Sequence, residues 1–161
     1  MAEQSDALAL AEILADMGDR LAIQGADDHR VRAYRRAAES LRALTTPLRD
    51  LQERGDLEEI AGIGDIFAAK IDEFLRTGKL ESHQKLCDHV PDGVVAMLSV
   101  PGVGPRRAQR FWRDLNITSL AELESAAKAG LLRQLKGIGR KTERTILIGA
   151  RAIQAGQLPR S

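Results

Sequence analysis

The sequence predicts an all-α protein made of two small helical subdomains. Apolar residues make up 43% of the 161 residues but aromatic residues only 3%, so the core must consist mostly of Leu, Ile, Val and Ala. No stretch shows the alternation of a strand, and apolar residues recur instead at helical spacing. Residues 91–93, Pro-Asp-Gly, indicate a turn. We place the boundary there, which gives subdomains of residues 1–89 and 90–161.

Start and stop signals divide each subdomain into helices. A first helix over 5–24 ends at Gly25, and Asp27 or Asp28 caps a second helix that ends before Thr45. The other helices of the first subdomain are expected at 47–51, after a cap at Asp56, at 65–76 and at 80–89. After residue 93 the order short helix, Gly-rich turn, helix repeats, with helices at 120–129, capped by Gly130, and at 140–154, before the chain frays at 156–159.

Several classes of protein are disfavoured by composition. The single cysteine, Cys87, excludes an internal disulfide, and its place in a helix favours a small buried apolar role over a nucleophile. No apolar run approaches the length of a membrane span, and the N-terminus does not resemble a signal peptide. We therefore expect a cytoplasmic, nucleoid-associated protein.

Charge is unevenly distributed along the chain although the net charge is only +1. Residues 1–100 hold 12 Lys and Arg against 19 Asp and Glu, a net charge of −7, whereas residues 101–161 hold 12 against 4, a net charge of +8. This asymmetry indicates that the second half meets a polyanion. On charge alone, a solvated basic face is the better explanation.

Three segments, at 60–65, 100–105 and 135–140, repeat one pattern: apolar, any residue, Gly, apolar, Gly, and then a helix. Two glycines allow a tight reversal with positive φ, and the apolar residue between them plugs the gap between two helices. The next helix then begins with unpaired N–H groups that suit a phosphate of any DNA sequence. This is the signature of the helix-hairpin-helix motif, with glycines at Gly62 and Gly64, Gly102 and Gly104, and Gly137 and Gly139, and plugs at Ile63, Val103 and Ile138.

Basic side chains surround the second and third turns. Cations in the first turn of a helix oppose the helix dipole, so several of them there favour an arriving anion. The first turn has Glu58, Glu59 and Asp65 instead. The third turn has Glu143 where the others have Ala68 and Ala108, so it is the one most suited to a purely structural role. The cations in question are Arg106, Arg107, Arg110 and Arg113, and Lys136, Arg140, Lys141 and Arg144.

The order of these blocks resembles more than a generic motif. Ala-Tyr-Arg-Arg-Ala-Ala at 33–38, Gly-Ile-Gly at 62–64 and Lys-Ile-Asp-Glu-Phe-Leu-Arg-Thr-Gly-Lys-Leu at 70–80 resemble the N-terminal portion of family X DNA polymerases, the DNA polymerase beta type. The second and third hairpins resemble the DNA-binding subdomain that follows in that family. The resemblance covers about residues 5–155 and implies sequence-independent binding of DNA with gaps, nicks or 5′-phosphorylated ends, in repair.

The catalytic parts of that family are not recognisable in the sequence. The polymerase palm carries clustered metal-binding aspartates, but this chain contains no Asp-x-Asp and stops at Ser161. The His/Asp-rich nuclease domain of the bacterial members is not recognisable either, since His29, His83 and His89 occur singly. We therefore do not expect polymerisation by this chain alone.

The resemblance also implies a lyase site in the first subdomain. Animal members remove a 5′-deoxyribose phosphate through a lysine Schiff base, and the matching residue is Lys70, beside the Phe67/Ile71/Phe74 stripe. A neutral amine is needed, which burial promotes and the nearby Glu73 opposes. Positions that hold the 5′ phosphate and orient the site in the family match His29, Arg30 and Tyr34, whereas Glu58, Ile66 and Ser82 replace family lysines. Arg35 is a further candidate DNA contact on the same predicted helix.

Two further expectations concern ligands and partners. No cofactor is required, but the family implies a monovalent cation, K⁺ or Na⁺, held by the backbone carbonyls of Leu98, Val100 and Val103. Trp112 is suited to stack on a base, although core packing is the commoner role. The alternative to DNA binding is a helical scaffold for protein partners, whose affinity is indifferent to Arg106, Arg107, Arg140 and Lys141.

Overall fold

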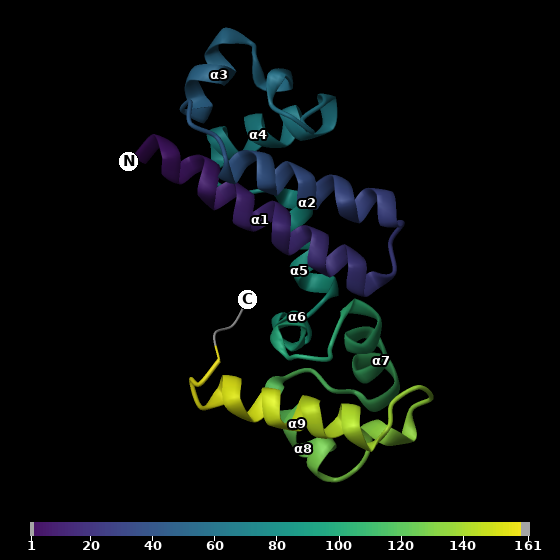
Figure 1. Cartoon of the computed structure of the whole chain (residues 1–161). Helices are drawn as coiled ribbons and strands as arrows, with labels where there is room; N and C mark the ends of the chain where they lie inside the picture. Colours follow the sequence, from purple (N-terminus) through teal and green to yellow (C-terminus); the bar gives the residue numbers. More distant parts are fainter. Residues whose placement is uncertain (1, 159–161) are drawn as a thin grey trace. The chain divides into compact units, whose positions relative to one another are not determined.

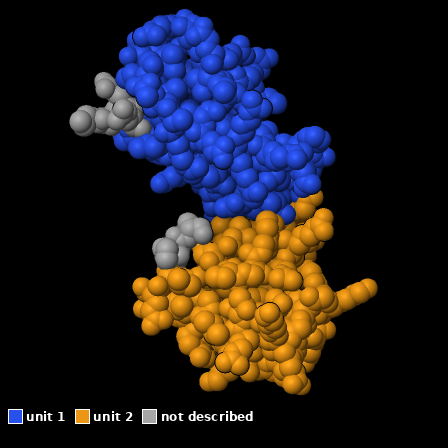
Figure 2. Space-filling model, viewed as in Figure 1, with its two compact units in different colours: residues 1–22, 26–89 blue, residues 23–25, 90–161 orange. Residues whose placement is uncertain are grey.

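The computed structural model describes residues 2–158, with side chains from residue 5 onward, and every element in this part of the chain is helical (Figure 1). This confirms the all-α prediction. The chain divides into two compact units, which Figure 2 colours separately. Unit 1 holds residues up to 22 and 26–89, and unit 2 holds residues 23–25 and those from 90 onward. None of the described helices is long and apolar enough to cross a lipid bilayer.

Unit 1 is a bundle around aliphatic side chains, as the composition requires. Leu10, Leu14, Leu41 and Ile71 are fully buried in it. Tyr34 is also buried, and its ring meets the Phe67 ring edge-on with centroids 5.0 Å apart. The elements are α1 (Ala2–Gln24), α2 (Asp28–Arg42), α3 (Leu48–Arg54), the 3₁₀ helix η1 (Leu57–Glu59), α4 (Asp65–Thr77) and α5 (Glu81–His89).

Unit 2 has its own core, in which Phe111, Met97 and Leu123 are completely buried. Within it, α8 (Leu120–Lys128) and α9 (Arg140–Gln154) pack along each other. Ile23, in the last turn of α1, belongs to this core, which the sequence did not indicate. The elements are α6 (Asp92–Ala96), η2 (Met97–Ser99), α7 (Pro105–Leu115), α8 (Leu120–Lys128), η3 (Leu132–Gln134) and α9 (Arg140–Gln154).

Side-chain caps fix the starts of α2 and α8. The Asp27 carboxylate accepts the His29 N–H at 2.7 Å, so Asp27 is the cap of α2. The Ser119 hydroxyl accepts the Glu122 N–H, and Glu122 reaches back to the Thr118 N–H at 2.8 Å. This is a capping box displaced by one residue, and its hydrogen bonds lower the pKa of Glu122.

Three local predictions were wrong. Residues 91–93 are not a turn: Pro91 precedes α6, and Gly93 lies inside that helix. A Cβ at Gly93 would stand 1.7 Å from the Thr118 carbonyl oxygen, so the glycine permits a close approach of backbones. Asp56 precedes a 3₁₀ helix and makes no capping hydrogen bond. Cys87 is only half-buried and lies beside a polar group.

Candidate nucleic-acid interface

The three repeated segments have the same backbone. In each, a 3₁₀ helix leads to an extended residue, then to a glycine with φ of 80° (Gly62), 93° (Gly102) or 86° (Gly137). The buried plug residue donates its N–H to the carbonyl three residues earlier, at 3.0, 3.0 and 3.2 Å. A second, extended glycine then precedes α4, α7 or α9. We call these turns hairpin 1 (60–65), hairpin 2 (100–105) and hairpin 3 (135–140).

Neither the backbone conformation nor the packing of the protein requires glycine at the second glycine position of each hairpin. Its φ lies between −97° and −104°, which any residue adopts, and a Cβ there would meet no atom within 4 Å. A Ser or Asp at this position would cap the helix, yet the three helices carry no side-chain cap. The N–H groups of the first turn are thus left exposed for an external acceptor. The glycines in question are Gly64, Gly104 and Gly139.

Hairpin 2 combines these N–H groups with arginines. Pro105 is the first helical residue and has no N–H, so Arg106 and Arg107 supply the donors. The Arg106 side chain is exposed, and Arg110 follows one turn later, half-buried. Arg107 instead folds back and donates to the Gly102 carbonyl at 2.8 Å, which stabilises the turn. Of the predicted contacts, Arg106 and Arg110 are therefore better placed than Arg107 for a ligand.

Hairpin 3 has exposed cations on both sides of its glycines, from Lys136 to Arg140, Lys141 and Arg144. None of the ion pairs in the described residues involves these four side chains. Glu143 is 6% exposed, and its carboxylate accepts the Arg133 N–H at 3.0 Å. It therefore caps η3 and points away from any ligand at the turn. The glutamate changes the packing of hairpin 3 without neutralising its surface.

Hairpin 1 has the same turn with the opposite surface. Asp65 opens α4, and a hydrogen bond with Asp65 raises the pKa of the exposed Glu58. Ile66 stands where hairpin 2 has Arg106, and it is 71% exposed. Two neighbouring carboxyl groups at the start of α4 repel a phosphate. Hairpin 1 thus has the same turn as hairpins 2 and 3 but lacks their positive charge.

A basic groove of about 690 Å³ lies beside hairpin 1, on the outer face of α2. Arg36 runs along Gly62, where an added Cβ would meet its Cγ at 3.2 Å. Arg35 is 3.4 Å from the Asp19 carboxylate, and Arg30 is exposed outside the groove. The lining residues are His29, Arg32, Ala33, Arg35, Arg36, Glu39 and Gly62.

Lys70 is half-buried at the edge of the apolar stripe of α4, as the spacing predicts. Its Nζ donates to the Ser82 hydroxyl at 3.1 Å and lies 5.9 Å from the centroid of the Tyr34 ring. Glu73, which the sequence suggested as an opposing charge, instead accepts the Glu81 N–H at 2.8 Å. No ion pair of the described residues includes Lys70.

The remaining predicted residues lie in unit 2. The Val100 carbonyl accepts the Val103 N–H at 3.0 Å, and Leu98 is half-buried in η2. Three backbone carbonyls are neutral oxygen donors, a set whose chemistry fits an alkali cation. Trp112 packs against the core of unit 2 with part of its surface exposed.

One cluster was missed from the sequence. Asp16, His83 and Cys87 bring their ligand atoms within 4.8 Å of one another in unit 1. His83 is still the single histidine of the cluster, whereas the expected apolar role of Cys87 is wrong, because its thiol lies beside the imidazole. The i, i+4 spacing of His83 and Cys87 was the available signal, whereas Asp16 is 67 residues from His83.

Comparison with known proteins agrees with this geometry. Residues 6–80 match the helix-hairpin-helix domain family, and residues 94–152 match the SAM-like helix-hairpin-helix tandem family. Both matched stretches are of the helix-hairpin-helix type, a DNA-binding class of domain. It is also similar to the DNA polymerase/3'-5' exonuclease PolX of Bacillus subtilis (strain 168), with 29% identity over 138 residues. The match covers 86% of this chain and 24% of that relative, so the chain spans about a quarter of its length. The predicted resemblance to the N-terminal region of family X polymerases is confirmed.

Proposed function

We propose that the chain binds DNA without reading its sequence, and that hairpins 2 and 3 hold the phosphate backbone. The favoured substrates are duplexes with a gap, a nick or a 5′-phosphorylated end, in a repair setting. Main-chain donors at a helix N-terminus meet phosphate whatever the neighbouring base. The proposal needs no cofactor and no side chain that reads base edges.

The observation that carries the proposal is the second glycine of the hairpins. At Gly104 and Gly139, neither backbone conformation nor packing requires glycine, and the helix N–H groups next to them are uncapped. A protein-interaction scaffold does not account for this bare helix end, because an ordinary cap would stabilise it better. The exposed cations around both turns supply the matching charge.

Preference for broken DNA is supported by the groove on α2. Its basic lining suits a terminal phosphate, which carries more charge than a phosphate within the chain. A DNA break offers such a terminal group together with a flanking duplex, so that unit 1 and unit 2 each have a ligand. Intact duplex offers only the second.

Fluorescence anisotropy tests this with 5′-phosphorylated gapped duplex and intact duplex across a salt series. We expect tighter binding to the gapped DNA than to the intact duplex. The logarithm of the binding constant should fall by about 0.9 per phosphate neutralised for each tenfold rise in salt concentration. Binding without salt dependence, or equal binding to both duplexes, would contradict the proposal. His29→Gln with Arg36→Gln should remove the preference for the gap and leave duplex binding intact.

A second candidate function is 5′-deoxyribose-phosphate lyase, with Lys70 as the nucleophile. It is favoured by the surroundings of the amine, which is half-buried between a hydroxyl and a ring face. The carboxylate of Glu73 accepts the Glu81 N–H and does not pair with the amine. The amine would attack the sugar aldehyde with loss of water, and β-elimination of the 3′ phosphate would follow from the Schiff base.

Borohydride reduction separates this activity from binding. On DNA with a 5′ abasic end, we expect a covalent adduct that is lost in Lys70→Ala, whereas Lys79→Ala on the exposed turn after α4 serves as control. No adduct with the unmodified chain, or an adduct that survives Lys70→Ala, would exclude Lys70 as the nucleophile. Either result leaves the proposal of DNA binding untouched.

We further propose that K⁺ or Na⁺ binds the carbonyls of Leu98, Val100 and Val103 when DNA is present. These oxygens lie in η2 and in hairpin 2, just before α7, so the cation would neutralise a neighbouring phosphate. At constant ionic strength, replacing K⁺ by a bulky organic cation should weaken binding. Equal affinity in both salts would contradict a bound ion.

A further inference from the structure

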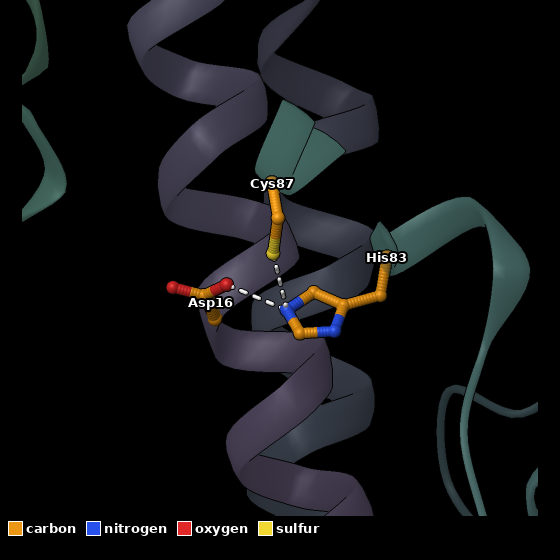
Figure 3. Close-up of side chains that lie close together, drawn as sticks. All are labelled: Asp16, His83 and Cys87. Carbon is orange, nitrogen blue, oxygen red and sulfur yellow. Dashed lines mark hydrogen bonds and ion pairs between the residues drawn. The ribbon is translucent and has the colours of Figure 1, made fainter. Parts of the chain in front are cut away.

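A cluster in unit 1, away from the three hairpins, has the chemistry of a metal site. Figure 3 shows Asp16 on α1 facing His83 and Cys87, which are one turn apart on α5. The His83 Nε2 atom is 2.7 Å from Asp16 Oδ2 and 3.5 Å from Cys87 Sγ. Carboxylate oxygen, imidazole nitrogen and thiol sulfur thus converge on one point.

This convergence differs from a proton relay. In a nucleophile–histidine–carboxylate arrangement, the thiol and the carboxylate bind opposite nitrogens of the imidazole ring. Here both lie against the same atom, Nε2. A histidine nitrogen flanked by two other ligand atoms on one side is the arrangement that a bound cation requires.

The two separations that involve His83 Nε2 fit a tetrahedral ion, one as it stands and one after a small adjustment. With Zn–S and Zn–N bonds of about 2.3 and 2.05 Å, tetrahedral angles place sulfur and nitrogen about 3.5 Å apart. The separation of Cys87 Sγ and His83 Nε2 is already 3.5 Å. The Asp16 oxygen, now hydrogen-bonded at 2.7 Å, must move back by roughly 0.6 Å, within the reach of a rotation about its side-chain bonds.

The surroundings orient the carboxylate. Arg20 is only 5% exposed, and its Nε donates to Asp16 Oδ2 at 2.7 Å. Hydrogen bonds from an outer residue to a ligating carboxylate are typical of metal sites. Once Cys87 has lost its proton to the incoming ion, the thiolate, the Asp16 carboxylate and the Arg20 guanidinium have a formal charge of −1. A dication is therefore not repelled.

We propose that Asp16, His83 and Cys87 bind a divalent cation of the zinc type, with a fourth position open to water or an exogenous ligand. Mixed S, N and O ligands in tetrahedral geometry suit Zn²⁺ rather than Mg²⁺ or Ca²⁺, which prefer oxygen. On binding, the Cys87 thiol loses its proton to solvent and the imidazole coordinates as the neutral form. The ion would join α1 to α5, the first and last helices of unit 1.

Cobalt substitution tests the site directly, because Cys87 is the single cysteine. We titrate the purified chain with Co²⁺ and record its absorption spectrum. One equivalent should produce intense visible bands of a tetrahedral ion and a thiolate-to-cobalt charge-transfer band in the near ultraviolet. Zn²⁺ should abolish both. The absence of the charge-transfer band from the unmodified chain would overturn the proposal, whatever any variant does.

Variants then assign the ligands. Loss of an outer-shell partner typically weakens metal affinity 10- to 100-fold, so Cys87→Ser and His83→Asn should each weaken Zn²⁺ binding by about 100-fold or more. His89→Gln, at the exposed end of the same helix, should bind like the unmodified chain. Zn²⁺ should raise the melting temperature of the unmodified chain and not of Cys87→Ser. Equal affinity in Cys87→Ser and the unmodified chain would also overturn the proposal.

Discussion

Hairpin 1 and hairpins 2 and 3 share a backbone and differ in their surface. All three have a positive-φ glycine, a buried plug and an extended glycine before an uncapped helix. Around hairpin 1 stand Glu58, Asp65 and the exposed Ile66, whereas arginines and lysines surround the other two. The turn is therefore a general way to join two helices. The residues around it decide whether a phosphate is attracted.

The comparison also separates the two units. Unit 1 has its cations on α2, in a groove beside hairpin 1, and unit 2 has them on the hairpins themselves. A groove suits the terminal phosphate of a DNA strand, whereas a helix N-terminus suits a phosphate inside the DNA strand. Under the proposed function, the two units would recognise different parts of broken DNA.

The largest effect is expected from removing the charge of hairpins 2 and 3. One variant combines four substitutions: Arg106→Gln, Arg110→Gln, Arg140→Gln and Lys141→Gln. Up to four phosphate contacts are lost in it, so the salt slope, which is the slope of log affinity against log salt concentration, should become shallower by about 3.6. Affinity at low salt should fall by orders of magnitude while the fold persists, because none of the four is buried. Anisotropy across a salt series measures both quantities. An unchanged slope would place the DNA elsewhere.

A graft onto hairpin 1 tests the comparison in the other direction. Asp65→Arg with Ile66→Lys copies the sequence of hairpin 3 onto the same backbone. If surface charge is all that hairpin 1 lacks, two added phosphate contacts should make the salt slope of DNA binding steeper by about 1.8. Asp65→Gln with Ile66→Gln is the control for simple removal of the acid. A graft that binds no better than this control would mean that the position of hairpin 1 also matters.

Glu143 distinguishes hairpin 3 from hairpin 2 in stability rather than in binding. Glu143→Ala restores the small residue of hairpin 2 but leaves the Arg133 N–H without its acceptor. The loss should be about 1–3 kcal/mol in the free energy of unfolding, with an unchanged salt slope. Denaturant unfolding measures it against Arg144→Ala, an exposed neighbour that should be neutral. Equal stability of the two variants would refute the structural role of Glu143.

The smallest effect concerns the acidic pair of hairpin 1. Since the pKa of Glu58 is raised by Asp65, the folded state favours the protonated carboxyl, and stability is lost as the pH rises through that pKa. Glu58→Gln should therefore melt slightly higher than the unmodified chain at pH 7, and the two should converge in acid. Thermal melts at several pH values report the difference. A difference that grows in acid would have the wrong sign.

Much of the fold followed from local signals. Helices α4 and α9 begin at Asp65 and Arg140, as expected, because a glycine turn directly precedes each helical pattern. Asp27 was one of two proposed caps, and the Phe67 stripe correctly placed Lys70 at its edge. Such features depend on neighbours within a few residues. They are therefore visible in a sequence.

The failures depended on contacts between distant residues. Gly93 looked like a turn glycine because its reason, the Thr118 carbonyl, is 25 residues away. Arg107 is an exception, because its bond to the Gly102 carbonyl is local but depends on a side-chain conformation that the sequence does not specify. The cluster of Asp16, His83 and Cys87 requires two helices to meet. The sequence spacing can indicate only the pair of His83 and Cys87, and not their contact with Asp16.

The most direct test of the account is a matched series in which Gly64, Gly104 and Gly139 are each replaced by valine. The added side chain points into open space at all three sites and suits an extended backbone, so the three variants should remain equally folded. Their affinities for one gapped duplex are then compared. At Gly104 and Gly139, obstruction of the helix N-terminus should weaken binding about tenfold or more, the value of a hydrogen bond to a charged group, whereas Gly64→Val should bind normally. Equal losses at all three, or none at Gly104 and Gly139, would contradict the claim that hairpins 2 and 3 grip phosphate and hairpin 1 does not.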